Sequence, residues 1–254
     1  MAIYVGPLIP PGNGSVQAQG QTFSNQVMTS LVTPVLCLMA VFFAYGLLRF
    51  HARRNEAVLD GPPLRNDARV QLLWIVITSA MVLFLAGFGT YELLKDGAGG
   101  GQGPNPIALP AGHKGAYPVQ VIAQQWQFTY RYPQYGGVET FSLALPVGRT
   151  VEFHVTSIDV IHSFWAYQLG VKADAVPGAD NIAYTTPQHV GLFQIRCAEL
   201  CGLWHGWMAA KGHVLSAAGW RRWIAHVQSA NAPSTHYLPK YAKVYYPAPL
   251  ERGG

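Results

Sequence analysis

The sequence has little charge: Asp, Glu, Lys and Arg make up only 11% of its 254 residues, against roughly 25% in an average soluble domain. Seventeen Lys and Arg against twelve Asp and Glu leave a net charge of only +5. No run of basic residues interleaved with aromatic residues occurs, which argues against a nucleic-acid partner. Because half of the residues are apolar, the low charge indicates contact with a membrane.

The first 26 residues contain no charged side chain and are rich in Gly, Pro, Gln, Asn and Ser. They lack the basic segment and apolar core of a standard secretory signal. An uncharged segment is easily transferred across a bilayer. We therefore interpret residues 1–26 as an exported N-terminal tail.

Two long uncharged runs follow, Val27–Leu48 and Val70–Tyr91, each of 22 residues. As helices they would be about 33 Å long, enough to cross a hydrocarbon core of about 30 Å. A buried core helix would normally show a polar stripe, and neither run has one. The runs predict a transmembrane helical hairpin over residues 27–95.

The distribution of arginine predicts the orientation of this hairpin. Residues 49–69 carry five arginines, whereas residues 1–26 carry no Lys or Arg. The positive-inside rule places the loop 49–69 in the cytoplasm and both termini outside. We therefore expect a multi-pass protein of the cell inner membrane, with everything after residue 95 on the periplasmic side.

Beyond the hairpin, residues 96–118 are rich in Gly and Pro and are interpreted as a flexible linker. The hydrophobic period then changes, because Val151, Phe153 and Val155 alternate with polar residues as in a half-buried strand. Further strands are predicted at Tyr117–Tyr132, Thr140–Val147, Asn181–Thr186, Gly191–Arg196 and Ala209–Leu215. Such a series of short strands predicts an all-β sandwich or barrel over residues 119–230.

The C-terminal part of the chain has a different pattern. Residues 217–229 place Trp220, Trp223, Ile224 and Val227 at helical spacing, which predicts a short amphipathic helix that closes the domain. Residues 231–254 are rich in Pro and Tyr and are predicted to form an extended tail.

Cysteine is scarce, and two of the three cysteines lie close together after a predicted strand. Cys197 and Cys201 are followed at short spacing by His205 and Met208, and His162 lies upstream. Thiolate, imidazole and thioether form a soft ligand set that favours copper. A disulfide between the cysteines and a tetrahedral zinc site of two Cys and two His are the alternatives. Neither alternative uses Met208, so the sequence favours copper.

The motif C-x-E-x-C-x3-H-x2-M, the upstream D-V-x-H-S at 159–163, the K-x-D-A-x-P-G segment at 172–178 and the two apolar runs together resemble subunit II of the haem–copper cytochrome c oxidases. The resemblance covers residues from about 25 to about 228. It implies a cupredoxin-like barrel that binds a dinuclear copper centre, CuA. The implied ligands are the bridging thiolates, two imidazoles, an axial thioether and one backbone carbonyl: Cys197, Cys201, His162, His205, Met208 and Glu199.

The resemblance also implies an electron-transfer subunit of a proton-translocating oxidase, whose oxygen-reducing site lies in subunit I. It assigns Trp126 as the surface aromatic through which electrons enter. It assigns the Glu199 carboxylate to a magnesium or manganese ion shared with subunit I, and places Asp174 near the same interface. The implied partners are the haem-bearing subunit I, subunit III, the lipid bilayer and a soluble one-electron donor, either a cytochrome c or a small copper protein.

Two positions depart from the family pattern. Gln71 stands where family members often carry a carboxylate near a proton-uptake channel. Arg131 lies in a segment that is usually acidic, so we expect a donor other than a strongly basic cytochrome c. A copper-delivery or copper-storage protein is the alternative function, although such proteins need labile, exposed ligands. A zinc-stabilised adhesion or assembly domain is a third interpretation.

Overall fold

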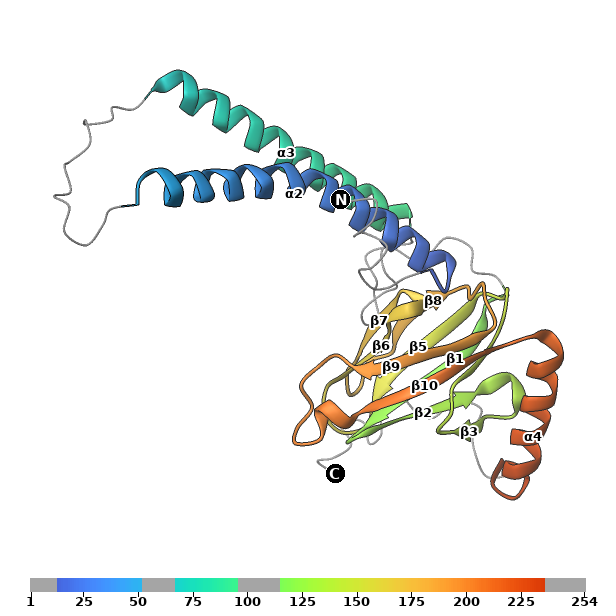
Figure 1. The fold of residues 1–254 in the computed structure, drawn as a ribbon. Helices are drawn as coiled ribbons and strands as arrows, with labels where there is room; N and C mark the ends of the chain where they lie inside the picture. The colour runs from blue at the N-terminus through green and yellow to red at the C-terminus, as the bar shows by residue number, and fades with distance from the viewer. Residues whose placement is uncertain (1–12, 52–66, 96–114, 236–254) are drawn as a thin grey trace.

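The computed structural model describes residues 13–51, 67–95 and 115–235. Two long helices come first and are followed by a β domain with one helix at its C-terminal end (Figure 1). The helices are α2 (Val16–Arg49), α3 (Ala68–Lys95) and α4 (Ala217–Thr235). This arrangement confirms the predicted fold class of two N-terminal apolar helices and an all-β domain.

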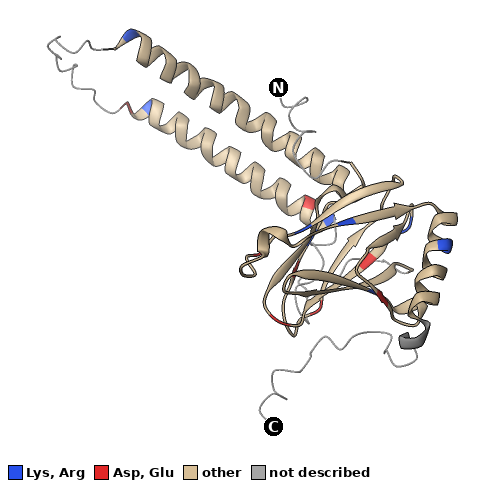
Figure 2. Cartoon of the chain, turned by 60° about the horizontal axis from the view of Figure 1, so that its bottom comes forward, with Lys and Arg blue, Asp and Glu red and all other residues tan. Residues whose placement is uncertain are grey.

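Helices α2 and α3 are long and apolar enough to cross a bilayer. Their charged residues lie only near the helix ends (Figure 2), and these are Arg49, Arg69, Glu92 and Lys95. Hydroxyl groups inside α2 donate to carbonyls one turn earlier, as Thr29 does to Asn25 and Thr33 to Thr29. Such bonds suit a lipid environment, because polar groups there must find partners within the protein.

Helix α2 begins eleven residues before the apolar run that predicted it. Its first residue is Val16, and Ser15 caps it by accepting a hydrogen bond from the Ala18 N–H at 3.0 Å. Residues 16–26 of the predicted N-terminal tail are therefore the first part of helix α2. Hydrophobicity could not reveal this first part of α2, because its residues are mostly polar and its helix start depends on the cap.

The strands of the β domain form two five-stranded sheets, with the orders β3-β2-β1-β5-β8 and β4-β10-β9-β6-β7. The strands are β1 (Tyr117–Gln124), β2 (Gln127–Tyr132), β3 (Val138–Thr140), β4 (Ala144–Pro146), β5 (Val151–Ser157), β6 (His162–Ala166), β7 (Val171–Ala175), β8 (Asn181–Thr185), β9 (Gly191–Cys197) and β10 (Ala209–Leu215). Most neighbouring strands are antiparallel, but β1 pairs with β5 and β4 with β10 in parallel.

The predicted strands differ from the observed ones in three places. The expected strand Tyr117–Tyr132 is a hairpin of β1 and β2 that turns at Gln125–Trp126, where no Gly, Pro or Asn marks the turn. The expected strand Thr140–Val147 is interrupted at residues 141–143, between β3 and β4. Strands β6 and β7 were not predicted.

Aromatic side chains fill the space between the two sheets. Phe164 of β6 meets Phe128 and Phe153 of the opposite sheet, with ring centroids 5.7 and 5.3 Å apart. Helix α4 covers one end of the domain, where Trp220 packs edge-on against Tyr117 at 5.4 Å. The helix ends at Thr235 and is therefore longer than the predicted segment 217–229.

Several predicted segments fall wholly or largely outside the described residues. These are the N-terminal residues 1–12, the loop 49–69, the linker 96–118 and most of the tail 231–254. Their predicted roles stay predictions.

Candidate metal centre

Three neighbouring strands bring the predicted ligand residues together at one end of the second sheet. His162 is the first residue of β6 and Cys197 the last of β9, and these strands pair with Phe164 opposite Cys197. Met208 directly precedes β10, and its carbonyl accepts the Cys197 N–H at 3.0 Å. Predicted ligand residues that are far apart in the sequence therefore meet because of strand pairing.

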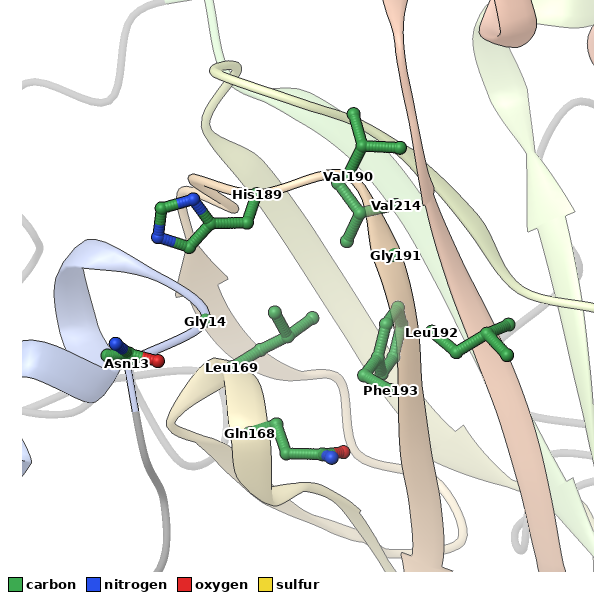
Figure 3. A pocket seen from close by; sticks show the side chains of 10 residues that line it. All are labelled: Asn13, Gly14, Gln168, Leu169, His189, Val190, Gly191, Leu192, Phe193 and Val214. Atoms are coloured by element: carbon green, nitrogen blue, oxygen red, sulfur yellow. The ribbon is translucent and has the colours of Figure 1, made fainter. Parts of the chain in front are cut away.

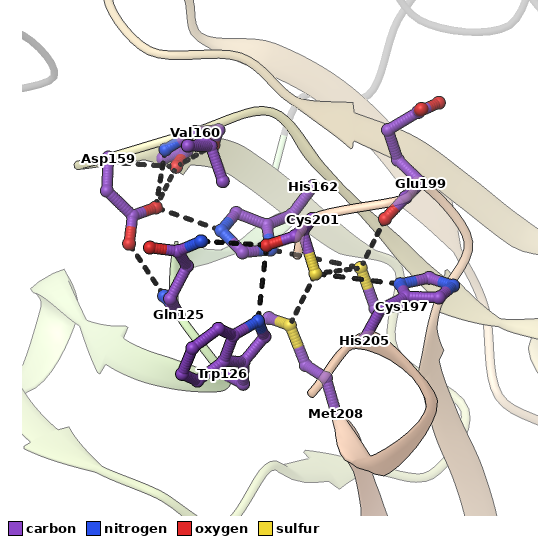
Figure 4. Close-up of polar contacts among 11 residues, drawn as sticks. Gln125, Trp126, Asp159, Val160, His162, Cys197, Glu199, Cys201, His205 and Met208 are labelled. Atoms are coloured by element: carbon purple, nitrogen blue, oxygen red, sulfur yellow. Dashed lines mark hydrogen bonds and ion pairs between the residues drawn. The ribbon is translucent and has the colours of Figure 1, made fainter. Parts of the chain in front are cut away.

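The loop between β9 and β10 carries the remaining predicted ligands. Gly202 adopts a φ of +113°, which favours glycine, and the His205 N–H donates to its carbonyl at 3.2 Å. His205 then begins a short 3₁₀ helix, η4 (His205–Trp207), whose end donates the Met208 N–H to the His205 carbonyl. This compact path turns the side chains of both His205 and Met208 toward Cys201 (Figure 4).

The sulfur atoms of Cys197 and Cys201 lie 3.7 Å apart and are the centre of the site. The sulfur of Cys197 lies 3.9 Å from Nδ1 of His162 and 3.2 Å from the carbonyl oxygen of Glu199. The sulfur of Cys201 lies 3.5 Å from Nδ1 of His205 and 3.8 Å from the Met208 sulfur. The two sulfurs thus link all six predicted donor atoms.

These spacings fit a metal centre. A four-coordinate site with metal–sulfur bonds of about 2.3 Å and metal–nitrogen bonds of about 2.0 Å sets its ligand atoms about 3.3 to 3.8 Å apart. The donor atoms of His162, Cys197 and Cys201 all lie within 4.8 Å of one another. Both cysteines are free thiols in the structure, so no disulfide occupies this position.

The surroundings of Cys197 favour loss of its thiol proton, which leaves a negative charge that suits a cation. Burial raises the pKa of the Cys197 thiol, but hydrogen bonds from the His162 ring and from nearby backbone outweigh this and lower the pKa to about 6. Burial and the neighbouring Cys197 raise the pKa of Cys201. One thiolate is therefore present at neutral pH, and a metal must bind deprotonated cysteine.

His162 is fully buried and is held by a carboxylate. Its Nε2 lies 2.9 Å from Oδ1 of Asp159, which leaves Nδ1 facing Cys197. Burial raises the pKa of Asp159, but the Gln125 N–H and the His162 ring outweigh it and lower the pKa. A carboxylate on the second ring nitrogen fixes the orientation of a histidine ligand, as is common around metals.

Trp126 is half-buried and contacts the site through the backbone of a cysteine. Its indole Nε1–H donates to the Cys201 carbonyl at 3.1 Å, and the Gln125 side chain donates to the same oxygen at 2.8 Å (Figure 4). The Gln125 N–H also donates to Asp159 at 2.7 Å. The turn between β1 and β2 therefore bonds both to the backbone of Cys201 and to the carboxylate that holds His162.

The side chain of Glu199 has a separate environment. Its carbonyl faces the sulfur of Cys197, whereas its carboxylate is exposed and points away from the sulfurs (Figure 4). Asp174 pairs with Ser163 across β7 and β6, next to His162. Arg131 is buried and paired with Glu139, with 2.6 Å between a guanidinium nitrogen and the carboxylate, so it presents no free positive charge at the surface.

Two residues with roles in the site were not predicted from the sequence. Asp159 was recognised only as part of a matching segment, although its position three residues before His162 could have indicated a hydrogen bond. Nothing in the sequence indicated a role for Gln125, because its hydrogen bonds to Asp159 and Cys201 span 34 and 76 residues and depend on the turn.

Comparison with known proteins adds independent evidence. A family model described as the periplasmic domain of cytochrome c oxidase subunit II matches residues 138–213. Cytochrome c oxidase subunit 2 of a Synechocystis strain is 27% identical over 241 residues, covering 82% of this chain and 71% of that protein. A probable cytochrome c oxidase subunit 2 of Rickettsia conorii is 26% identical over 214 residues, covering 76% of this chain and 63% of that protein.

Among solved structures, the periplasmic domain of subunit II of cytochrome oxidase from Bradyrhizobium japonicum is 27% identical, with a TM-score of 0.44. It covers 45% of this chain and 94% of its own length. The family match to a periplasmic domain and the two apolar helices agree with a membrane subunit that carries a periplasmic domain. The family match and the curated relatives support cytochrome c oxidase subunit II, the electron-transfer subunit of that oxidase, as the protein that this chain is similar to.

Proposed function

We propose that the chain would hold a dinuclear copper centre, with Cys197 and Cys201 supplying two thiolate ligands. The other four ligands would be the two imidazoles, the thioether and one backbone carbonyl, from His162, His205, Met208 and Glu199. The observation that carries this proposal is the set of distances of 3.2 to 3.9 Å that link these six donors through the two sulfurs. Four of these donors would suffice for zinc, and the thioether and carbonyl favour copper.

Copper at this position would supply one-electron transfer without bond chemistry on a substrate. The protein's own residues keep the ligands in place: Asp159 orients His162, and strand pairing holds Cys197 beside Met208. Burial of both cysteines and of Met208 excludes water from the sulfur atoms. A ligand set that hardly moves suits electron transfer, because little reorganisation is needed.

Trp126 is proposed as the point of electron entry from a soluble donor, with the haem-bearing subunit I as the acceptor. Its indole hydrogen bond to the Cys201 carbonyl supports this, since it connects a half-buried aromatic to the backbone of a thiolate ligand. The exposed carboxylate of Glu199 is available for a magnesium or manganese ion at the subunit I interface. A hard carboxylate suits such ions.

The test is metal analysis and visible absorption of the full-length chain, purified in detergent and loaded with copper. We expect two coppers per chain and thiolate charge-transfer colour, both lost in Cys197→Ser and Cys201→Ser. One colourless zinc per chain would disprove the proposal.

Copper delivery or storage, the second candidate, is distinguished by exchange. A storage or delivery site would pass its copper rapidly to a soluble chelator. The burial of Cys197, Cys201 and Met208 predicts slow loss instead.

A further inference from the structure

The first residues of α2 are joined to the β domain by backbone hydrogen bonds. The Gly14 N–H donates to the Gln168 carbonyl at 3.1 Å, and the Gln188 N–H donates to the Gly14 carbonyl at 3.0 Å. The Val16 N–H donates to the Thr186 carbonyl at 3.2 Å. Figure 3 shows Gly14 beside Gln168 and Leu169, at the edge of a pocket of 260 Å³. The chain before α2 is therefore paired with the domain like a short strand.

Ser15 lies at the centre of this contact and is fully buried. Its hydroxyl donates to the Leu169 carbonyl at 2.7 Å and accepts the Ala18 N–H at 3.0 Å. One side chain thus caps the helix and binds the domain at the same time. A change at Ser15 therefore affects both the start of α2 and its attachment to the domain.

The next turn of α2 adds side-chain bonds and close packing. The Gln17 side chain accepts the Thr186 N–H at 2.9 Å, and the Gln21 side chain donates to the Gly170 carbonyl at 2.8 Å. A Cβ on Gly170 would lie 2.7 Å from the Ala18 nitrogen, and Ala18 is fully buried. Only small residues allow α2 to approach the domain this closely.

The length of α2 explains how the contact can form. The uncharged run Val27–Leu48 suffices to cross a bilayer, yet α2 begins at Val16. The additional residues 16–26 extend the helix by about 16 Å on the side of the β domain. This extension reaches the domain instead of ending at the membrane surface.

We propose that residues 14–21 are a positioning element that fixes the β domain, and with it the metal loops, to the outer end of α2. Ser15 and Gly14 are its positioning residues. The domain is then held at one place relative to the membrane, as electron transfer to a partner subunit at a fixed distance requires. The attachment itself follows from the contacts above and does not depend on the metal, whereas its value for electron transfer rests on the proposed function.

The test measures amide hydrogen exchange of Thr186 and Gln188 in the full-length chain in detergent. Their N–H groups bond to Gln17 and Gly14, so they report on the attachment. Gly14→Ala places a Cβ 2.5 Å from the Gln168 carbonyl oxygen and should force the contact apart. Ser15→Ala removes the cap and the bond to Leu169. We expect exchange at both amides to become about tenfold faster or more in each variant.

Matched controls lie on the same helix. Gly46→Ala adds a Cβ with nothing within 4 Å, and Ser24→Ala removes a hydroxyl whose bond stays within α2. Both should leave Thr186 and Gln188 unchanged, and the Cys197 amide inside the β9–β10 pair should be unchanged in all four variants. Equal exchange of Thr186 and Gln188 in wild type and Gly14→Ala, or equal acceleration of every amide in the domain, would overturn the proposal.

A second measurement separates this proposal from the copper assignment. In the assembled, copper-loaded oxidase, Ser15→Ala should slow electron delivery to subunit I while the visible spectrum of the metal centre stays unchanged. If the wild-type chain shows no copper colour, the proposed function fails while the exchange result still stands. An unchanged rate of delivery with a detached domain would contradict the positioning role.

Discussion

A substitution at Met208 tests whether its side chain holds the metal or only adjusts its reduction potential. It is 2% exposed, and its sulfur lies 3.8 Å from the Cys201 sulfur. Met208→Leu keeps the volume of the side chain, so the domain should lose less than about 1.5 kcal/mol of stability. We expect both coppers to remain and the reduction potential to shift by tens of millivolts, where about 59 mV is a tenfold change for one electron. Redox titration with metal analysis measures both, and loss of copper would show that Met208 holds the metal.

Gln125 and Trp126 share one acceptor, the Cys201 carbonyl, and this makes their effects dependent on each other. Gln125→Leu or Trp126→Phe alone leaves one donor, whereas the double variant leaves neither. We expect the free energy of unfolding of the double variant to fall by about 0.5 to 3 kcal/mol more than the sum of the single changes.

The measurement is urea unfolding, in detergent, of the parent chain, the two single variants and the double variant, which together form a double-mutant cycle. The exposed Gln127→Leu, at the first residue of β2, is the control and should have little effect. Additivity within about 0.5 kcal/mol would mean that water replaces the missing donors.

At the scale of elements, alternating burial helped to identify some strands but not all of them, since β7 alternates and was not predicted. Strand β5 was recognised because Phe153 and Val155 are buried between half-buried or polar neighbours. Strand β6 was not, since four of its five residues are buried and no alternation is visible. The predicted ligand residues were readable because five of the six donors lie within the twelve residues 197–208. Gln125 and Asp159 instead depend on loops that meet only in the folded domain.

Strands β5 and β8 are joined by a histidine between two carboxylates. His154 lies 2.8 Å from Glu152 through Nε2 and 2.8 Å from Asp180 through Nδ1. Burial lowers the pKa of His154, but its bonds to these two carboxylates outweigh burial and raise the pKa above its usual value of 6.5. The protonated histidine therefore stabilises the pairing of these strands.

The sign of the pH dependence follows. A raised pKa contributes stability that is complete below about pH 6.5 and is lost as the pH rises through the pKa of the folded state. The unfolding free energy should fall over that range by at most about 1.4 kcal/mol per pH unit for this one proton. His154→Gln should flatten this part of the profile in urea unfolding series. An identical profile in the variant would assign the pH dependence to other groups.

For the whole molecule, the arginines of residues 49–69 predict which side of the membrane each part occupies. Asp60→Cys, in that loop, should react with an impermeant thiol reagent only from the cytoplasmic side of intact membranes. A cysteine introduced at the exposed Gly206, at the metal end of the domain, should react only from the periplasmic side. The parent chain, with its three native cysteines, gives the background. Labelling of position 60 from outside would refute the orientation.

The surface charge of the domain predicts the kind of donor. From Asp96 onward, eleven Lys and Arg stand against eight Asp and Glu, a net charge of +3. Arg131 does not add a free charge near Trp126, because it is buried against Glu139. The metal loop instead exposes large apolar side chains, with Leu203 83% and Trp207 80% exposed. A donor should therefore dock mainly through apolar contacts, with a face that is neutral or acidic.

Turnover of the assembled oxidase with a strongly basic cytochrome c, measured across ionic strength, tests this expectation. Association steered by opposite charges is fast at low salt and slows steeply as salt is added, because the Debye length shrinks to about 3 Å at 1 M. We expect slow turnover at low salt that stays flat or rises with added salt, since the domain offers little negative charge to a basic partner.

Charge reversal at the exposed Glu199 is not a usable control because of its proposed interface role, so Lys211→Gln, on an exposed position of β10, serves instead. It should leave the salt profile flat. Fast turnover at low salt that collapses on adding salt would locate an acidic docking surface on another subunit or outside the described residues.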